Sequence, residues 1–426
     1  MLKKYRVGME EVFCFFALSV LSGAYVDFPM PKRSNAMGMG QNNPFNTGAM
    51  LIVLSGLVLF GWTLRHRLLE IARQAWPATL LVLFAGISSI WSFDGMVTLR
   101  RTTTLMIAVS FGFFLVARFP VDGIIRRLTL VSLIITISSI FAALFVPAMG
   151  VMSDGELAGR WSGVFPHKQQ LGAAMFIGAL CASWYGANGK KWTKIGAWLM
   201  VLVCLGVILM ARSQTALLSV VAIPLVIAAA RIVRLRPMAR LWALYGLTAA
   251  LIGICVLLAM YLESFMLFLG RDVSLTGRAP LWDLLMEIAA KRPLNGYGYG
   301  AFWVAGNPIT LYVNAVSGWY VPEAHNGYLD LQLQTGLPGL LLAVTILWST
   351  FRSSLAGIAA RVPWASFAVA YVVITAVTNL VESTLFRTGD MQCVLLPLLY
   401  AAFRTQQAPV QMEIIPRGAA GAASTE

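Results

Sequence analysis

A histidine and a glutamate two residues apart, His325 and Glu323, form the pair in this sequence with the clearest capacity for proton transfer. Imidazole titrates near neutral pH, so it can take a proton from a hydroxyl, and a nearby carboxylate can orient the ring. Two further histidines differ in setting: His167 lies in a polar stretch between apolar runs, and His66 stands between two arginines as a solvated turn residue. The alternative for His325 is an interfacial histidine that only caps or hydrogen-bonds.

Several basic residues lie at the outer ends of the apolar runs, against the rule that basic residues concentrate on the cytoplasmic side of a membrane protein. Arg212 is the clearest case, because an arginine at membrane depth costs roughly 2.5–3.5 kcal/mol and usually faces a cavity or a partner. Guanidinium groups bind phosphate bidentately, so several of them around one mouth would suit a diphosphate carried on a membrane lipid. The alternative is that these side chains reach the lipid headgroups. The residues in question are Arg100, Arg101, Arg160, Lys168, Arg212, Arg271 and Arg278.

Glycines alternate with tyrosines at residues 296–300, where Tyr297 and Tyr299 could offer stacking faces to sugar rings. The aromatic residues could equally form an interfacial belt. The patch is no dinucleotide fingerprint, because it lacks the spacing and the preceding strand of that motif. We find no metal-binding pattern and expect neither a metal nor a cofactor. The five cysteines lie in apolar runs without partners, which indicates packed side chains.

The elements that must position these residues are membrane helices. The chain of 426 residues is 58% hydrophobic and 12% charged, whereas a water-soluble domain carries about 25% charged residues. A span needs about 20 apolar residues, and by that measure we expect an all-α polytopic membrane protein with about 12 transmembrane helices. The predicted spans are 11–28, 46–64, 77–93, 98–117, 128–147, 169–187, 195–211, 214–231, 241–262, 329–350, 363–381 and 389–404.

One long polar connection interrupts this series and gives a division of the chain. We expect transmembrane helices 1–9 within residues 1–262, a large periplasmic loop over 263–328, helices 10–12 within 329–405, and a disordered cytoplasmic tail over 406–426. A structureless loop of that length would be unusual. The pattern of residues 280–288, with Pro280 in the first turn and Pro293 beyond the end, predicts a short helix there.

The distribution of charge predicts the orientation. Every predicted cytoplasmic segment carries basic residues, while most acidic residues fall on the opposite side, as the positive-inside rule requires. We therefore expect both termini on the cytoplasmic side of the membrane. The net charge of +14 is accounted for as an orientation signal, and we expect no nucleic-acid partner.

Taken together, these residues resemble the bacterial O-antigen ligase and polysaccharide polymerase superfamily, and within it the exopolysaccharide polymerases of the succinoglycan type. The similarity covers roughly residues 85–345. It departs from the family pattern at Gln169, where asparagine is usual, and at residues 212–215. The stretches that carry the resemblance are WSFD at 91–94 with LRR at 99–101, GVFPHKQQLG at 163–172, LGRDVSLTGRAPLW at 269–282 with PLNGYGYGAF at 293–302, and His325-Asn326 followed by Gly336 and Gly339.

The resemblance implies a polytopic glycosyltransferase of the C-type in the bacterial inner membrane, which takes a glycan from undecaprenyl diphosphate on the periplasmic face without a metal. His325 would match the essential histidine of the family, and Arg212 and Arg278 would match the arginines that hold the donor diphosphate. We expect Arg271 to join these arginines. The residues expected to contact substrate are Glu323, Asn326, Tyr297, Tyr299, Arg160, His167 and Lys168.

These expectations describe an enzyme that joins lipid-linked oligosaccharide repeat units into exopolysaccharide, within a membrane and with a chain-length regulator as a possible partner. The nearest alternative is a ligase that moves finished O-antigen onto lipid A-core, since the two differ only in the acceptor. A flippase or transporter of polar solutes is a third possibility. Transporters place their sites near the middle of the bilayer between repeats, and no such repeat is visible here.

Overall fold

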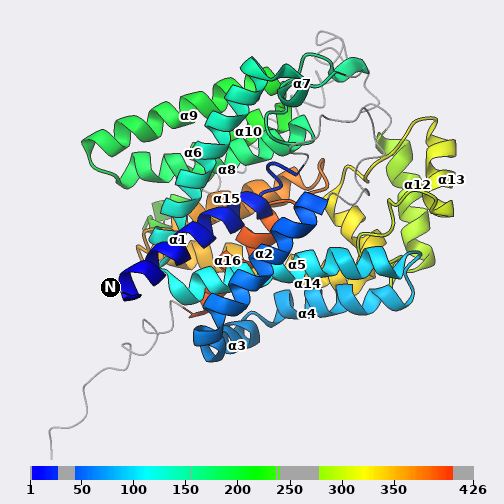
Figure 1. Ribbon diagram of the computed structural model, residues 1–426, viewed down its shortest axis with the longest axis horizontal. Helices are drawn as coiled ribbons and strands as arrows, with labels where there is room; N and C mark the ends of the chain where they lie inside the picture. The colour runs from blue at the N-terminus through cyan, green and yellow to red at the C-terminus, as the bar shows by residue number, and fades with distance from the viewer. Residues whose placement is uncertain (1, 27–43, 154, 237, 240–277, 406–426) are drawn as a thin grey trace, which may run out of the picture.

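The computed structural model describes residues 2–26, 44–153, 155–236, 238–239 and 278–405. The described chain is helical, and the only β-pairing in it is an isolated bridge between Val151 and Trp161. This confirms the predicted all-α membrane fold (Figure 1). The helices are α1 (Leu2–Leu21), α2 (Pro44–Gly61), α3 (Arg65–Gln74), α4 (Trp76–Ile87), α5 (Gly95–Arg118), α6 (Val121–Phe145), α7 (Pro147–Gly150), α8 (Lys168–Asn188), α9 (Lys191–Ala211), α10 (Gln214–Ala230), α12 (Arg278–Lys291), α13 (Pro308–Ser317), α14 (Gly327–Ala359), α15 (Ala365–Thr378) and α16 (Gln392–Thr405).

Six helical stretches of the described chain are long and apolar enough to cross a membrane: Pro44–Gln74, Gly95–Arg118, Val121–Phe145, Lys191–Ala211, Gln214–Arg234 and Gly327–Ala359. Two shorter apolar helices, Trp76–Ile90 and Ala365–Thr378, accompany them. The predicted count of twelve spans stays a prediction, because the span expected at 241–262 lies outside the described residues. The tail from 406 lies outside them as well.

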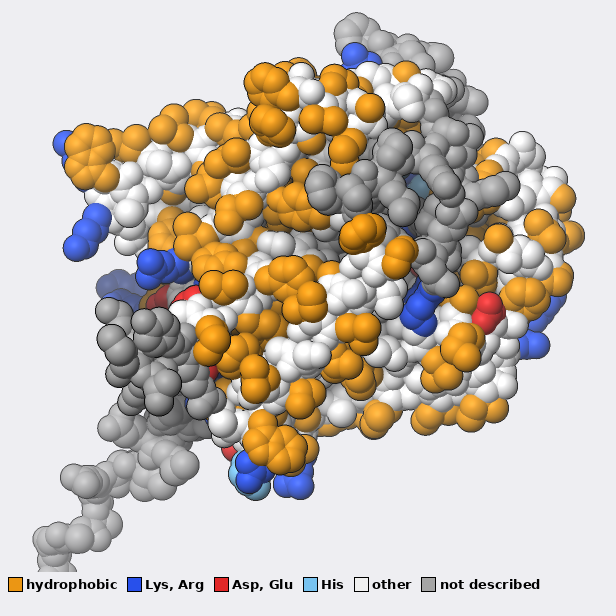
Figure 2. Space-filling model, in the orientation of Figure 1, with side chains coloured by type: hydrophobic (Ala, Val, Ile, Leu, Met, Phe, Trp, Pro, Cys, Tyr) orange, Lys and Arg blue, Asp and Glu red, His pale blue; other side chains and the backbone are white. Residues whose placement is uncertain are grey.

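The helices form two groups joined by α15. One group contains α6, α8, α9 and α10, and the other contains α4, α5, α14 and α16, while α15 packs against α8, α10 and α14. Figure 2 shows apolar side chains spread over the visible flank, which is what a lipid-facing surface requires. The core contains α16, whose side chains are buried from Gln392 to Phe403. Gly112 lets α5 approach closely, because a Cβ there would lie 2.9 Å from the main-chain oxygen of Val394.

The segment that leads from α12 to α14 packs at one end of the bundle, where Figure 1 shows α12 and α13 beside each other. Helix α12 confirms the short helix predicted at 280–288 and extends it at both ends. The domain boundaries proposed from the sequence stay predictions.

A break inside α14 fixes this segment to the membrane helices. Gly336 has φ 66° and ψ −170°, so the helix continues in a new direction beyond it. The freed main-chain groups find partners in the preceding loop: Leu337 N–H donates to Pro293 O at 2.7 Å, and Tyr297 and Gly298 N–H donate to Leu333 O and Gln334 O. Glycine is required here because the left-handed conformation disfavours a side chain.

Replacing Gly336 with alanine should destabilise the protein. The new Cβ would lie 2.6 Å from the main-chain carbon and oxygen of Leu294, and a strained residue of this kind costs about 1–3 kcal/mol of unfolding free energy. We expect a lower melting temperature in detergent. Gly206→Ala in α9 is the control, because a Cβ there meets nothing within 4 Å and alanine is favoured in helices. Equal melting temperatures for the two variants would contradict this account.

Candidate functional site

The start of α14 places His325 in a fixed position. Asn326 caps the helix, its Oδ1 accepting from Tyr328 N and Leu329 N at 3.1 Å, and its own N–H donates to Ser383 Oγ at 3.1 Å. His325 itself has φ 50°, a left-handed conformation that is uncommon outside glycine. The predicted substrate residue Asn326 is therefore the cap of α14, and its contacts fix the backbone next to His325.

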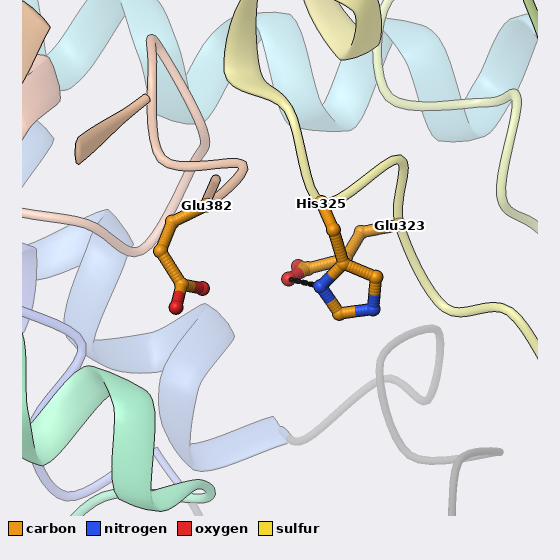
Figure 3. Close-up of side chains that lie close together, drawn as sticks. All are labelled: Glu323, His325 and Glu382. Atoms are coloured by element: carbon orange, nitrogen blue, oxygen red, sulfur yellow. Dashed lines mark ion pairs between the residues drawn. The ribbon is translucent and has the colours of Figure 1, made fainter. Parts of the chain in front are cut away.

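Glu323 lies beside the imidazole and is nearly buried, with 5% of its surface exposed. Its Oε1 is 3.4 Å from His325 Nδ1, and its Oε2 forms an ion pair with Arg387 Nη1. Figure 3 shows that the other ring nitrogen, Nε2, points away from the carboxylates. His325 Nδ1 forms no hydrogen bond within the described residues, but the nearby carboxylate charge favours a proton on Nδ1, which leaves the lone pair on Nε2 to accept a proton.

A third ionisable group, Glu382, approaches the same imidazole from the turn after α15. Its carboxylate accepts from Gln169 Nε2 and from Thr215 Oγ1, both at 2.9 Å. One ligand atom from each of Glu323, His325 and Glu382 lies within 4.8 Å of the others (Figure 3). Segments from α8, α10, the α15–α16 connection and the α14 start thus meet at one point.

The electrostatic environment favours a neutral imidazole. Burial lowers the pKa of His325, Glu323 raises it in opposition, and the positive charges of Arg278 and Arg387 lower it further. Burial raises the pKa of the Glu382 carboxyl, and the negative charge of Glu323 adds to that rise. A neutral imidazole is the form that can act as a base, and here it is the favoured form at neutral pH.

The structure brings Arg278 to this cluster. Arg278 begins α12, and its Nη1 donates to Val381 O at 3.0 Å, one residue before Glu382. Its positive charge acts on both His325 and Glu382. Arg271, the third arginine expected to bind diphosphate, lies outside the described residues.

Arg212 joins the site through the N-terminus of α8. It ends α9 in a left-handed conformation with φ 48°, its side chain is exposed, and its carbonyl accepts from Lys168 Nζ at 3.2 Å. Lys168 is adjacent in sequence to Gln169, which binds Glu382, so the Arg212 turn and the His325 cluster share one anchoring segment. His167 caps α8, accepting at Nδ1 from Gln169 N.

Arg160 lies in the connection between α7 and α8, next to the bridge residue Trp161. Trp161 N–H donates to Met210 O, which places this connection against the end of α9. The Nε atom of Arg160 is buried and has no hydrogen-bond partner among the described residues. Four predicted site residues therefore lie around the start of α8 and the α9–α10 turn: Arg160, His167, Lys168 and Arg212. A fifth, Arg278, is connected to them through the segment that carries Glu382.

Tyr297 and Tyr299 hold the loop in place. Both are buried, the Tyr297 hydroxyl donates to Ile288 O at 2.8 Å, and the Tyr299 hydroxyl donates to Phe386 O at 2.5 Å. Burial also raises the pKa of the Tyr299 hydroxyl well above its usual range. Neither ring has an exposed face in this conformation. Their placement therefore does not support the predicted contact with a sugar, which stays a prediction.

The residues that our sequence analysis did not assign to the site are Glu382, Arg387, Gln169 and Thr215. The connection of residues 379–391 did contain a signal. It carries a glutamate, an arginine and an aspartate between two apolar runs, and the arginine lies on the predicted outer side, against the positive-inside rule.

The donor set of two carboxylates and one imidazole is of a type that binds divalent metals. However, Glu323 is already paired with Arg387, and the charge of Arg278 reaches both His325 and Glu382. A cation would have to compete with two guanidinium groups here. The expected absence of a metal and of a cofactor stays a prediction.

The fold and the site define a polytopic all-α membrane protein with a histidine, two carboxylates and arginines gathered at one end of its helices. A sequence model of the family described as O-antigen ligase matches residues 198–344. The chain is 29% identical over 297 residues to the exopolysaccharide production protein ExoQ of Rhizobium meliloti (strain 1021), across 64% of this chain and 63% of that protein. These matches confirm the resemblance to the O-antigen ligase and polysaccharide polymerase superfamily.

We predict that His325 titrates below 6.5, its ordinary value. A variant with His66→Gln and His167→Asn leaves it as the sole histidine, and the pH dependence of its modification by diethylpyrocarbonate reports the pKa. Adding Glu323→Gln should lower the midpoint further, because the carboxylate is the charge that opposes the shift. The same titration on a variant that retains only His66 calibrates the reagent. A midpoint at or above 6.5 for His325 would contradict this electrostatic description.

Proposed function

We propose that the protein is a membrane glycosyltransferase that polymerises undecaprenyl-diphosphate-linked oligosaccharide repeat units into exopolysaccharide at the periplasmic face of the inner membrane. The observation that carries the proposal is the convergence of Glu323, His325 and Glu382 within 4.8 Å, with Arg278 bonded one residue away. The family described as O-antigen ligase and the relative named for exopolysaccharide production support it. Both termini would lie in the cytoplasm.

In the proposed reaction, a hydroxyl of the acceptor sugar attacks the anomeric carbon of the donor. A glycosidic C–O bond forms as the bond between that carbon and the diphosphate oxygen breaks, and undecaprenyl diphosphate leaves. His325 Nε2 orients the hydroxyl and takes its proton. Glu323 then stabilises the imidazolium from the Nδ1 side, and Glu382 adds a second acidic group near the ring.

The arginines take the charge that develops on the leaving group. Preorganised cationic donors stabilise such charge without having to reorganise during the reaction. Arg278 is held at the cluster by its bond to Val381 O, and the exposed Arg212 would face the diphosphate from the α9–α10 turn. Since the donor carries its own lipid anchor, it would reach these arginines from the membrane.

A ligase that transfers polysaccharide to lipid A-core is the second candidate, because the matching family is described by that activity. The relative named for exopolysaccharide production favours polymerase. The products of a deletion strain decide between them. Loss of polymer with single repeat units remaining supports polymerase, whereas long chains that lack a lipid A-core anchor support ligase. A flippase or transporter is disfavoured, because this site is built at helix ends and in connections.

We predict that His325→Ala abolishes polymer formation. Loss of a general base typically costs about 10²–10⁴ in rate, and cellular polymer should fall below detection. His66→Ala in α3 is the matched control and should leave polymer unchanged. Membrane levels are compared by immunoblot. Normal polymer from the His325 variant at normal protein levels would remove the proposed site.

Arg278→Ala should reduce the rate of polymer formation about 10²- to 10³-fold, which is the usual effect of removing one hydrogen-bond donor to the transition state. Arg231→Ala, which removes an exposed arginine in the 3-10 turn after α10, controls for the loss of a guanidinium group elsewhere. With purified protein and lipid-linked oligosaccharide, the Arg278 variant should form glycosidic bonds slowly. A rate equal to that of the Arg231 variant would contradict the diphosphate role.

A further inference from the structure

An exposed tryptophan lies against the catalytic imidazole. Trp319 is 39% exposed, and its ring lies 6.1 Å from that of His325, with the two planes inclined by 30°. Among the aromatic side chains that the sequence offered for sugar binding, Tyr297 and Tyr299 are buried and bonded to main-chain carbonyls. Among the aromatic residues that the structure describes, Trp319 both lies next to His325 and has an exposed surface.

The backbone around Trp319 holds it in this place. Gly318 ends α13 with φ 74° and reverses the chain. The side chain of Asn314 then accepts from Val321 N at 2.8 Å, so the turn is closed on both sides of Trp319. Val321 and Ala324 are fully buried, and Trp282 Nε1 donates to Ala324 O at 2.9 Å. The indole thus projects from a short, anchored loop whose next residues carry Glu323 and His325.

We infer that Trp319 forms the apolar wall of the acceptor-sugar subsite. This inference rests on the proposed function and names where its acceptor binds. A sugar ring has an apolar face of C–H groups and a rim of hydroxyls, so it can stack on an indole while one hydroxyl points sideways. The centroid separation of 6.1 Å is that of an offset stack, so a sugar ring on the uncovered part of the same indole face would lie beside the imidazole, where Nε2 could receive the hydroxyl proton.

The occupant is the acceptor rather than the donor because of what surrounds the imidazole. The donor sugar must stay attached to its diphosphate, and the arginine expected to hold that group, Arg278, is bonded to the 379–391 connection at Val381. Trp319 lies in a different segment, the loop between α13 and α14. The base touches the attacking hydroxyl, so the sugar that stacks beside the base is the one that supplies this hydroxyl.

The test measures binding of the lipid-free oligosaccharide repeat unit to the purified full-length protein in detergent by saturation-transfer NMR. Trp319→Ala should raise the dissociation constant about tenfold, since aromatic contacts of this kind contribute binding free energy on that scale. Trp319→Phe, which keeps an aromatic face, should stay within about threefold of the parent. Trp319→Leu keeps bulk without a π face, and it should bind as weakly as the alanine variant.

Tyr312→Ala is the matched control. Tyr312 is an exposed aromatic residue on α13 that interacts electrostatically with Lys291 at the far end of α12. That helix has 14 residues, so its ends are about 20 Å apart, and Arg278 stands at the other end. This variant should bind the oligosaccharide like the parent protein.

Three results would overturn the inference: unchanged binding in the alanine and leucine variants, equal loss in the Tyr312 variant, or no binding by the parent protein. Unchanged binding together with poorer membrane extraction would indicate that Trp319 is an interfacial anchor. His325→Ala separates this inference from the proposed function. It should bind the oligosaccharide but form no polymer, and polymer formation by that variant would reject the proposed function while leaving the binding result intact.

Discussion

The ion pair between Glu323 and Arg387 holds together the two connections that build the site. Glu323 belongs to the loop before α14, and Arg387 belongs to residues 379–391 between α15 and α16. A largely buried pair of this kind, with the Arg387 side chain 27% exposed, adds little net stability because the ions lose hydration, yet removal of one partner leaves an uncompensated charge. The pair is therefore better understood as a device that fixes geometry. It sets the position of the carboxylate that faces His325.

Asn379 supports the same arrangement through hydrogen bonds to both connections. Its carbonyl accepts from Gly327 N at the start of α14, and its Oδ1 accepts from Leu385 N at 2.8 Å. Little room is left for change at this contact, because a Cβ on Gly327 would fall 2.0 Å from Asn379 Oδ1. Glu382 then extends from this turn to Gln169 and Thr215, so a displacement of α8 or α10 would move an acidic group relative to the imidazole. The two helix groups are coupled where chemistry is proposed.

The sequence was sufficient for the helical membrane fold, because long apolar runs permit few other structures. It also located His325, Glu323 and Asn326, which lie together in the chain and carry a family-like motif. It could not place Tyr297 and Tyr299, since a tyrosine can serve equally in an aromatic belt or in a core where its hydroxyl finds a carbonyl. Glu382 lies 57 residues beyond His325, and its relevance depends on packing that no local pattern encodes.

The brevity of α15 and α16 has a consequence for the proposed reaction. Each has 14 residues and rises about 21 Å, which is less than the roughly 30 Å thickness of the hydrocarbon layer. Their connection, residues 379–391, contacts the first turns of α8, α10 and α14 through Gln169, Thr215 and Gly327, so it lies level with the starts of these longer helices. In the proposed reaction, the sugars would then meet the site at the ends of the membrane helices, within reach of the lipid headgroups. A glycan formed there would leave outward, so under the proposed polymerisation each added unit would move the finished part away from the membrane.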